Sequence, residues 1–297
     1  MERIVQCVPN FSESRDTDIF DALIDAAYVP GVILADFSAN ESHNRCVATL
    51  LGEPSAIAEA SFAMARVAVE RIDLTKHSGV HPRVGALDVL PFVPLRQVTM
   101  DECVDVALSV GARIASELSV PVYLYDFASP DRFTLPQLRK GGLEGLTERM
   151  ATRPPDFGSA KPHPTAGVTL VGARNPLLAY NVNLDTDDVR VARRIAKRIR
   201  EFREALPGVR ALGLLVAGKA QVSCNITDTS LVSLLTVNAA VLKFAKEEGV
   251  GVEDSELIGG ITTEDLVHAL NDALDSEIRI SQVLDAWLPA FLSLEDG

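Results

Sequence analysis

The fold is decided by residues 179–226, which read AYNVNLDTDDVRVARRIAKRIREFREALPGVRALGLLVAGKAQVSCNI. Short apolar runs bounded by turn residues predict strands, and longer stretches between them predict helices. From residue 179 onward the predicted order is strand, helix, strand, strand, helix, strand, over residues 179–184, 186–203, 209–216, 221–226, 230–248 and 255–258. This order is typical of a ferredoxin-like sheet backed by helices.

The first half of the chain repeats this order without a detectable sequence repeat. Its predicted strands and helices cover residues 4–9, 16–27, 32–37, 45–52, 54–71 and 86–92, followed by a helix over 100–118 and a strand over 120–125. Residues 127–164 are rich in Pro and Gly and are interpreted as an arm and linker. We therefore expect an α/β (α+β) protein with two ferredoxin-like βαββαβ subdomains, over 1–165 and 166–297, and a ligand in the crevice between them.

Composition limits the classes of partner. The chain has 297 residues, 47% of them hydrophobic, which suits two domains with their own cores. Its formal charge of -13 argues against nucleic acid or an anionic membrane as a partner. The four cysteines are scattered without a CxxC pair, no signal-like start is evident, and no apolar run approaches the ~20 residues of a membrane span. A cytoplasmic location is expected.

One loop concentrates chemically active side chains, from Lys76 through His77, His81 and Arg83 to Asp88. The spacing of the two histidines is that of a zinc-binding helix, but a Gly and a Pro in the loop oppose a helix, so a metal is disfavoured. A second alternative is a pair of packed loop histidines. Because a histidine can accept and return a proton while flanking cations hold an anion, acid–base chemistry on an anionic substrate is the favoured interpretation.

Further polar residues lie near predicted strand ends and are candidate ligand contacts: Asn10, Asn44, Arg45, Arg174, Asn181, Asn183, Gln221 and Asn225. The period of two places Asn181 and Asn183 on one strand face, and Gln221 and Asn225 on another. Such a face meets either water or a polar ligand. The two arginines can each hold a carboxylate, or form a surface salt bridge.

The chain resembles the glutamate formimidoyltransferase (formiminotransferase) family over nearly its whole length. The similar segments are CVPNFSE at 7–13, HNR at 43–45, KHSGVHPRVGALD at 76–88, PVYLY at 121–125, PDFG at 155–158, GAR at 172–174, NVNL at 181–184 and QVS at 221–223. The resemblance implies transfer of a formimino group from N-formiminoglutamate to tetrahydrofolate in histidine and one-carbon metabolism, without a metal. It also implies that His81 of the His-Pro-Arg motif is catalytic.

One position departs from the family pattern. Where the family often carries Asp-Val-Asp, this chain has Asp36, Phe37 and Ser38, so Asp36 or water is expected to replace the second acid. Lys76, Arg45, Arg83 or Arg174 would hold carboxylates of the donor or of folate. The alternatives are a related transferase that uses formiminoglycine or 5-formyltetrahydrofolate, and a folate-binding protein without catalysis. A homodimer is expected, and a cyclodeaminase activity would reside elsewhere.

Overall fold

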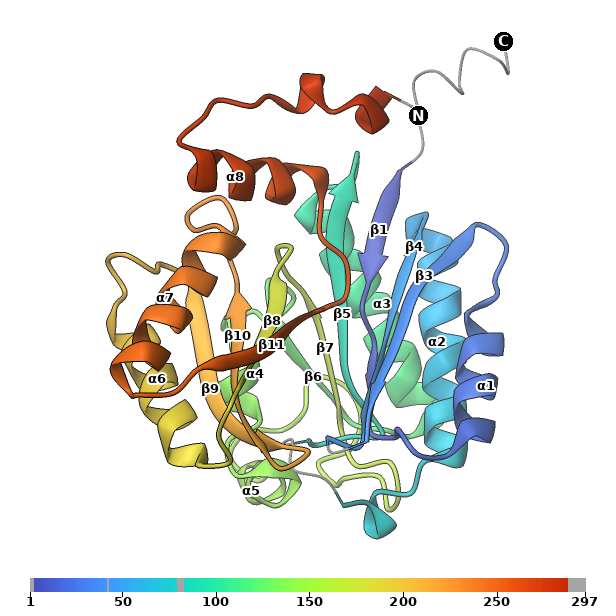
Figure 1. The fold of residues 1–297 in the computed structure, drawn as a ribbon. Coiled ribbons are helices and arrows are strands. Elements are labelled where there is room, and N and C mark those ends of the chain that lie inside the picture. Colours follow the sequence, from blue (N-terminus) through green and yellow to red (C-terminus); the bar gives the residue numbers. More distant parts are fainter. Residues whose placement is uncertain (1–2, 42, 79–82, 288–297) are drawn as a thin grey trace. The chain divides into compact units, whose positions relative to one another are not determined.

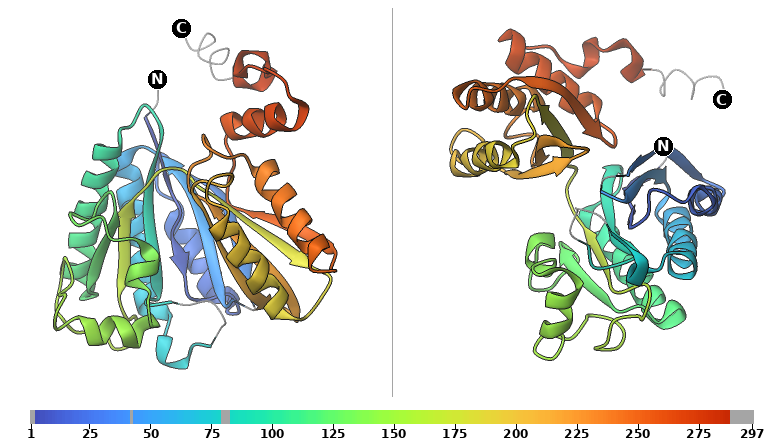
Figure 2. Two further views of the ribbon diagram at one scale, coloured as in Figure 1. Left: turned by 90° about the vertical axis from the view of Figure 1, so that its left-hand side faces the viewer. Right: turned by 60° about the horizontal axis from the view of Figure 1, so that its bottom comes forward.

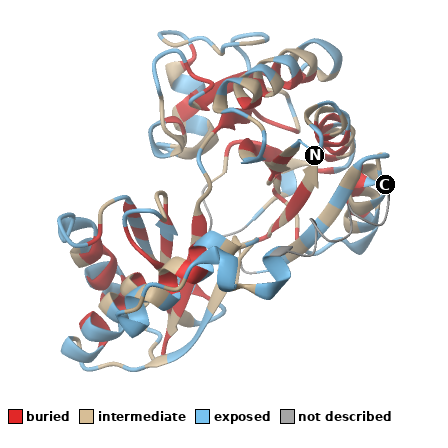
Figure 3. Ribbon diagram, turned by 90° about the horizontal axis from the view of Figure 1, so that it is seen from above, coloured by how far each residue is buried: buried red, intermediate tan, exposed pale blue. Residues whose placement is uncertain are grey.

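The computed structural model describes residues 3–41, 43–78 and 83–287. They divide into two compact units, Met1–Pro176 and Leu177–Gly297 (Figure 1). In each unit the buried residues are concentrated on the strands and on the helix faces that meet them (Figure 3). No helix within these described ranges is long and apolar enough to cross a membrane.

The second unit has the predicted ferredoxin-like fold. Its elements are β8 (Leu178–Leu184), α6 (Val189–Glu201), β9 (Val209–Val216), β10 (Lys219–Ile226), α7 (Leu234–Glu247) and β11 (Val252–Ile258). The sheet order is β11-β8-β10-β9, and every neighbouring pair is antiparallel. Buried residues of α6 and α7 form one hydrophobic cluster with residues of the sheet. A further helix, α8 (Thr263–Leu274), was not predicted from the sequence and packs against α7.

The first unit begins with the same arrangement and extends it. Its first elements are β1 (Ile4–Cys7), β2 (Asn10–Phe11), α1 (Thr17–Ala27), β3 (Val32–Asn40), β4 (Arg45–Gly52), α2 (Pro54–Arg71), η1 (Leu74–Lys76) and β5 (Leu87–Arg96). Strands β3, β4, β1 and β5 are neighbours in that order, as in the second unit. Two parallel strands lengthen the sheet beyond β5, because β7 (Thr169–Ala173) pairs with β5 and β6 (Val122–Asp126) pairs with β7.

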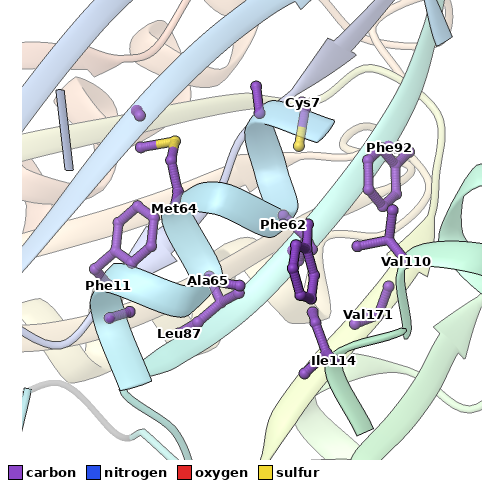
Figure 4. Packing of buried hydrophobic residues seen from close by; sticks show 14 of the residues in the cluster. Cys7, Phe11, Phe62, Met64, Ala65, Leu87, Phe92, Val110, Ile114 and Val171 are labelled. Carbon is purple, nitrogen blue, oxygen red and sulfur yellow. The ribbon is translucent and has the colours of Figure 1, made fainter. Parts of the chain in front are cut away.

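Helices α1, α2 and α3 (Met100–Leu118) cover one face of this first sheet (Figure 2). The start of α3 is fixed by a capping box between Thr99 and Glu102. Under the helices, Phe62 of α2 and Ile114 of α3 are buried against Phe92 of β5 (Figure 4). Full burial of such a side chain stabilises the fold by about 1.5–3 kcal/mol.

The opposite face, called here the far face, carries a second hydrophobic cluster. Leu138 of α4 (Leu135–Leu138) and Leu146 of α5 (Gly142–Arg149) are buried with Tyr123 of β6. The interpretation of residues 127–164 as an arm and linker is therefore wrong, because their apolar side chains pack on the sheet. The subdomain boundary expected at 165/166 also precedes β7, whereas the first unit includes β7 and ends at Pro176.

Candidate active site

Strand register places three of the predicted site residues on the far face of the first sheet. Along β4, the residues that pack under the helices alternate with Arg45, Val47 and Thr49, which lie on the opposite side. Asn10 pairs with Val47, and Asp36 pairs with Thr49. Asp36 is exposed on β3. The short strand β2 thus brings Asn10 beside Arg45, whose guanidinium donates a hydrogen bond to the Asn10 side-chain oxygen.

A buried carboxylate lies next to this pair. Asp88 of β5 is 1% exposed, and its Oδ1 accepts a hydrogen bond of 2.8 Å from the Val84 backbone N–H. Its Oδ2 lies 3.7 Å from Arg45 Nη1 and forms an ion pair with the guanidinium of Arg139. Asn10 is itself held by a 2.6 Å hydrogen bond from its Nδ2 to the Val8 carbonyl. Three segments distant in sequence therefore meet at one carboxylate.

Three arginines influence one another and Asp88 electrostatically. Burial, and then the positive charge of Arg139, lower the pKa of Arg45 to about 9, while Asp88 acts in the opposite direction. The pKa of Arg83 is also lowered, first by burial, and Asp88 and Arg139 both act on it electrostatically. We call Arg45, Arg83 and Arg139 the arginine cluster. Within the described part of the chain, Arg139 Nε is buried without a hydrogen-bond acceptor. A cationic cluster with a spare donor on Arg139 suits a carboxylate ligand.

Arg83 connects the cluster to the histidine loop. It donates hydrogen bonds to the backbone oxygens of His43 and Asn44, at 3.0 Å and 3.3 Å. His77 Nε2 lies 3.0 Å from the Asn44 carbonyl, and Arg83 Nη1 lies 2.6 Å from His77 Nδ1. Arg83 Nη1 also contacts His77 Nε2, and because an arginine N–H can only donate, the imidazole that accepts from it is neutral. Burial, followed by the charge of Arg83, lowers the pKa of His77, which favours the same neutral form.

Asn44 holds the surrounding loops together. It is 4% exposed and has a positive φ of 45°. Its Oδ1 accepts a 2.9 Å hydrogen bond from the Ser14 backbone N–H, and its Nδ2 donates to the Ser78 carbonyl at 3.1 Å. Because both ends of the amide bind protein backbone, the described contacts give Asn44 a positioning role. A direct ligand contact by Asn44 stays a prediction.

His81 lies outside the described residues, within the gap 79–82. The residues at the two ends of this gap are described, and both contact Asn44: Ser78 through its carbonyl and Arg83 through its guanidinium. The histidine loop is thus anchored next to the arginine cluster. Among the described residues, no group of three or more His, Cys, Asp and Glu could hold a metal ion. Since His81 is not among them, the expected absence of a metal stays a prediction.

Lys76 lies apart from the arginine cluster. Its side chain is 83% exposed and its Nζ is 3.2 Å from Asp73 Oδ2. Lys76 and His77 border a surface pocket of about 600 Å³, together with Asn44, Arg71 and the first turn of α1. This pocket adjoins the histidine loop, but its lining mixes both signs of charge.

Arg174 follows β7 and contacts a second buried polar residue, Tyr125. Its backbone N–H donates to the Phe92 carbonyl at 3.1 Å, and burial lowers the pKa of its guanidinium. Burial raises the pKa of the Tyr125 hydroxyl, which Arg174 and Arg139 partly offset by their charges. The Tyr125 ring lies over Gly172, where an added Cβ would be 2.6 Å from the ring. Glycine is therefore required beneath this tyrosine.

The four amide residues predicted in the second unit lie on the sheet face opposite α6 and α7. Gln221 pairs with Asn183 in the register of β10 and β8, and Asn225 pairs with Ala179 further along. Gln221 Nε2 donates to Asn183 Oδ1 at 3.0 Å, and Asn181 Nδ2 donates to Glu256 Oε1 at 3.0 Å. Asn225 is exposed. Three of the four amides thus belong to hydrogen-bonded rows across the sheet.

Arg139 was missed by sequence reasoning. It stands in the segment interpreted as a linker, immediately after α4. The available signal was the capping box between Thr134 and Gln137, which marks a helix start just before this arginine. No local pattern indicates that the side chain reaches Asp88.

Comparison with known proteins agrees with the two units. Residues 4–174 match the formiminotransferase domain, N-terminal subdomain, and residues 179–280 match the formiminotransferase domain. The two matches together cover most of an α/β protein with paired ferredoxin-like units. The chain belongs to the formiminotransferase family.

Three relatives illustrate the similarity. The chain is 44% identical over 266 residues to a glutamate formimidoyltransferase of Streptococcus pyogenes serotype M1, covering 87% of this chain and 89% of that relative. It is 38% identical to a glutamate formimidoyltransferase of Thermoplasma acidophilum, covering 89% of this chain and 90% of that relative. It is 41% identical to the formimidoyltransferase-cyclodeaminase of Rattus norvegicus, covering 93% of this chain but 53% of that longer protein.

Proposed function

We propose that the protein is a glutamate formimidoyltransferase, which transfers the formimino group of N-formiminoglutamate to tetrahydrofolate. The observation that carries this proposal is the arginine cluster around Asp88 in a chain of the formiminotransferase family. The donor has two carboxylates, and the buried, unsatisfied Nε of Arg139 in this cluster is an N–H from which a carboxylate would accept a hydrogen bond. Because the overall charge is -13, an anionic substrate needs local cations of this kind in order to bind.

His81 is proposed as the acid–base catalyst. It removes the proton from the tetrahydrofolate nitrogen that forms a bond to the formimino carbon. When the bond between that carbon and the glutamate nitrogen breaks, His81 returns a proton to the departing amine. One imidazole thus serves both steps, and protons balance. His77, four residues earlier in the sequence, contacts Arg83 and the Asn44 carbonyl.

The remaining roles follow from charge and position. Arg45 and Arg83 would bind carboxylates of the donor, with Asn10 and Asn44 holding them in place. Lys76 and Arg174 would meet the carboxylates of the folate tail. Asp36, exposed on the same sheet face as Arg45, is proposed as the carboxylate that assists His81. The amides of the second unit would contact folate. A homodimer and a cytoplasmic location complete the proposal.

A spectrophotometric assay of tetrahydrofolate conversion tests this function. The wild-type protein and His81→Ala are compared with formiminoglutamate, formiminoglycine and 5-formyltetrahydrofolate as donors. We expect turnover with formiminoglutamate, lowered about 10²–10⁴-fold in the variant while folate binding is kept. Turnover with another donor alone would select the related transferase. Folate binding without any turnover would select the non-catalytic alternative, and Ser38→Asp would then be the first substitution to examine.

A further inference from the structure

A chain of three polar side chains crosses the sheet of the second unit from β11 to β10. Asp254 pairs with Asn183 in the register of β11 and β8, and Asn183 pairs with Gln221 in that of β8 and β10. Asn183 Nδ2 donates to Asp254 Oδ1 at 2.6 Å. Gln221 Nε2 donates to Asn183 Oδ1 at 3.0 Å. The three side chains form a continuous hydrogen-bonded row, which we call the amide row.

The carboxylate at one end fixes the direction of the whole row. The oxygen and nitrogen of an amide side chain are hard to tell apart by shape, so their assignment depends on hydrogen-bond partners. An ionised carboxylate can only accept, so Asn183 must present its NH₂ group to Asp254 and its oxygen to Gln221. Gln221 must then present its own NH₂ group to Asn183. Its Oε1 is left as an acceptor at the far end of the row.

This terminal oxygen is buried and unsatisfied. Gln221 is 1% exposed, and no partner for its Oε1 exists among the described residues. Leaving a buried acceptor without a donor costs about 1–3 kcal/mol. A ligand N–H at this position would remove that cost. The row thus has the properties of a prepared acceptor site, in which a solvent-exposed acid orients a buried carbonyl oxygen.

The surroundings select the kind of ligand. Leu214 of β9 pairs with Gln221 on the side away from Asn183, which places an apolar side chain next to the acceptor. In the neighbouring row Asn181 donates to Glu256, so a second acid lies on the same face. Two carboxylates disfavour an anionic ligand. An apolar surface beside acceptors suits a flat heterocycle with N–H donors on its edge.

We propose that Gln221 Oε1 accepts a hydrogen bond from an N–H group of the folate pterin ring, and that Asp254 is a positioning residue that sets this polarity. The inference rests on the proposed function, since it assumes folate as a substrate. It assigns the pterin N–H to the amide row of the second unit.

Two ligands separate this role from a general structural one. Tetrahydrofolate contains the pterin, whereas p-aminobenzoylglutamate contains only the folate tail. Dissociation constants of both are measured by calorimetry for the wild type, Gln221→Met and Asp254→Asn. Glu253→Gln is the matched control, because Glu253 is a neighbouring exposed acid on β11 that pairs with Lys219.

Gln221→Met is expected to weaken tetrahydrofolate binding about threefold to tenfold, the effect of one hydrogen bond. Asp254→Asn should give a smaller loss, because Asn183 can then adopt either orientation. Neither variant should change binding of p-aminobenzoylglutamate, and the control should change neither ligand. Unchanged tetrahydrofolate affinity in both variants, or equal losses for the two ligands, would overturn the inference.

The exposed position of Asp254 keeps the test valid if Gln221→Met fails to fold. Turnover by the wild type with formiminoglutamate is measured separately. Absence of that turnover would count against the proposed function. Turnover together with normal tetrahydrofolate affinity in Asp254→Asn would instead count against the amide row alone.

Discussion

Arg139 and the buried Asp88 form a partly buried ion pair although 51 positions separate them in the sequence. Their side chains are 15% and 2% exposed. The pair joins the segment that covers the far face to the start of β5, and it lies beside Arg45. Asp88 is the carboxylate on which the arginine cluster converges, so its charge matters for both stability and binding.

Replacing Asp88 with Asn should lower the free energy of unfolding by about 3–5 kcal/mol. Asn preserves the size of the side chain and can still accept from the Val84 N–H, but it leaves the guanidiniums without their countercharge. Urea denaturation measures the change. Glu59→Gln is the control, since Glu59 pairs with Arg113 at the surface and should cost about 0–1 kcal/mol. Equal losses in the two variants would contradict the assignment of Asp88 as the centre of the cluster.

Arg45→Lys should raise the KM for formiminoglutamate about tenfold to a hundredfold, with little change in the KM for tetrahydrofolate. Lysine keeps the charge but lacks the planar fork that lets Arg45 bind Asn10 and face Asp88 together. Steady-state kinetics with each substrate varied in turn measures the effect. Arg190→Lys, at an exposed position, should leave both constants unchanged. A normal donor KM in Arg45→Lys would remove Arg45 from the donor site.

His77 should make the protein less stable as the pH falls. Its pKa is lowered in the folded protein from the ordinary 6.5, so below that value the unfolded chain binds a proton that the folded chain does not. The neutral imidazole contributes fully to the free energy of unfolding above pH 6.5. This contribution is lost as the pH falls from 6.5 toward the lowered pKa of the folded protein. The difference in unfolding free energy between wild type and His77→Gln, measured from about pH 8 to pH 5, should shrink accordingly.

The same lowering can be observed directly by NMR titration of His77. Arg83→Gln removes the second cause of the lowered pKa and should move it back toward 6.5. The prediction would be contradicted if the unfolding free energies of wild type and His77→Gln changed in parallel with pH and the pKa of His77 were close to 6.5. The imidazole would then not be affected by burial and by the charge of Arg83.

Gly172→Ala should destabilise the first unit by about 1–3 kcal/mol, because the new methyl group would overlap the Tyr125 ring. Thermal unfolding measures the loss. Gly260→Ala is the control, since a Cβ at Gly260 meets nothing within 4 Å. A loss at Gly172 no larger than at Gly260 would mean that Tyr125 moves aside freely.

Much of the fold could be predicted from the sequence because its main elements are long and periodic. The helices expected over 54–71 and 100–118 have the observed bounds of α2 and α3. The strand expected over 4–9 ends at Cys7, and after Val8 and Pro9 a separate short strand, β2, follows that was not predicted. Pro9 has no N–H to donate to a sheet, and this interrupts the strand. The prediction followed the apolar pattern and did not take Pro9 into account.

The site was less predictable than the fold, because its contacts depend on chain packing. Asn10 and Arg45 were named from their positions at strand ends, and the register does bring them together. Arg139 was missed because its segment has frequent Gly and Pro, which resemble a linker. Leu138 and Leu146 show no clear period there, and they are buried in a cluster with residues of β5, β6 and β7 that lie far from them in the sequence.

The position of β7 affects the order in which the protein can be built during synthesis. Since β7 lies between β5 and β6, β6 has no neighbouring strand until residues 169–173 have left the ribosome. A nascent chain that stops at residue 165 would keep the contacts of β6 with Phe133, Asp156 and Phe157 but would lack its partner strand β7. The stretch that precedes Arg174 therefore completes the first sheet, just before the second unit begins at Leu177.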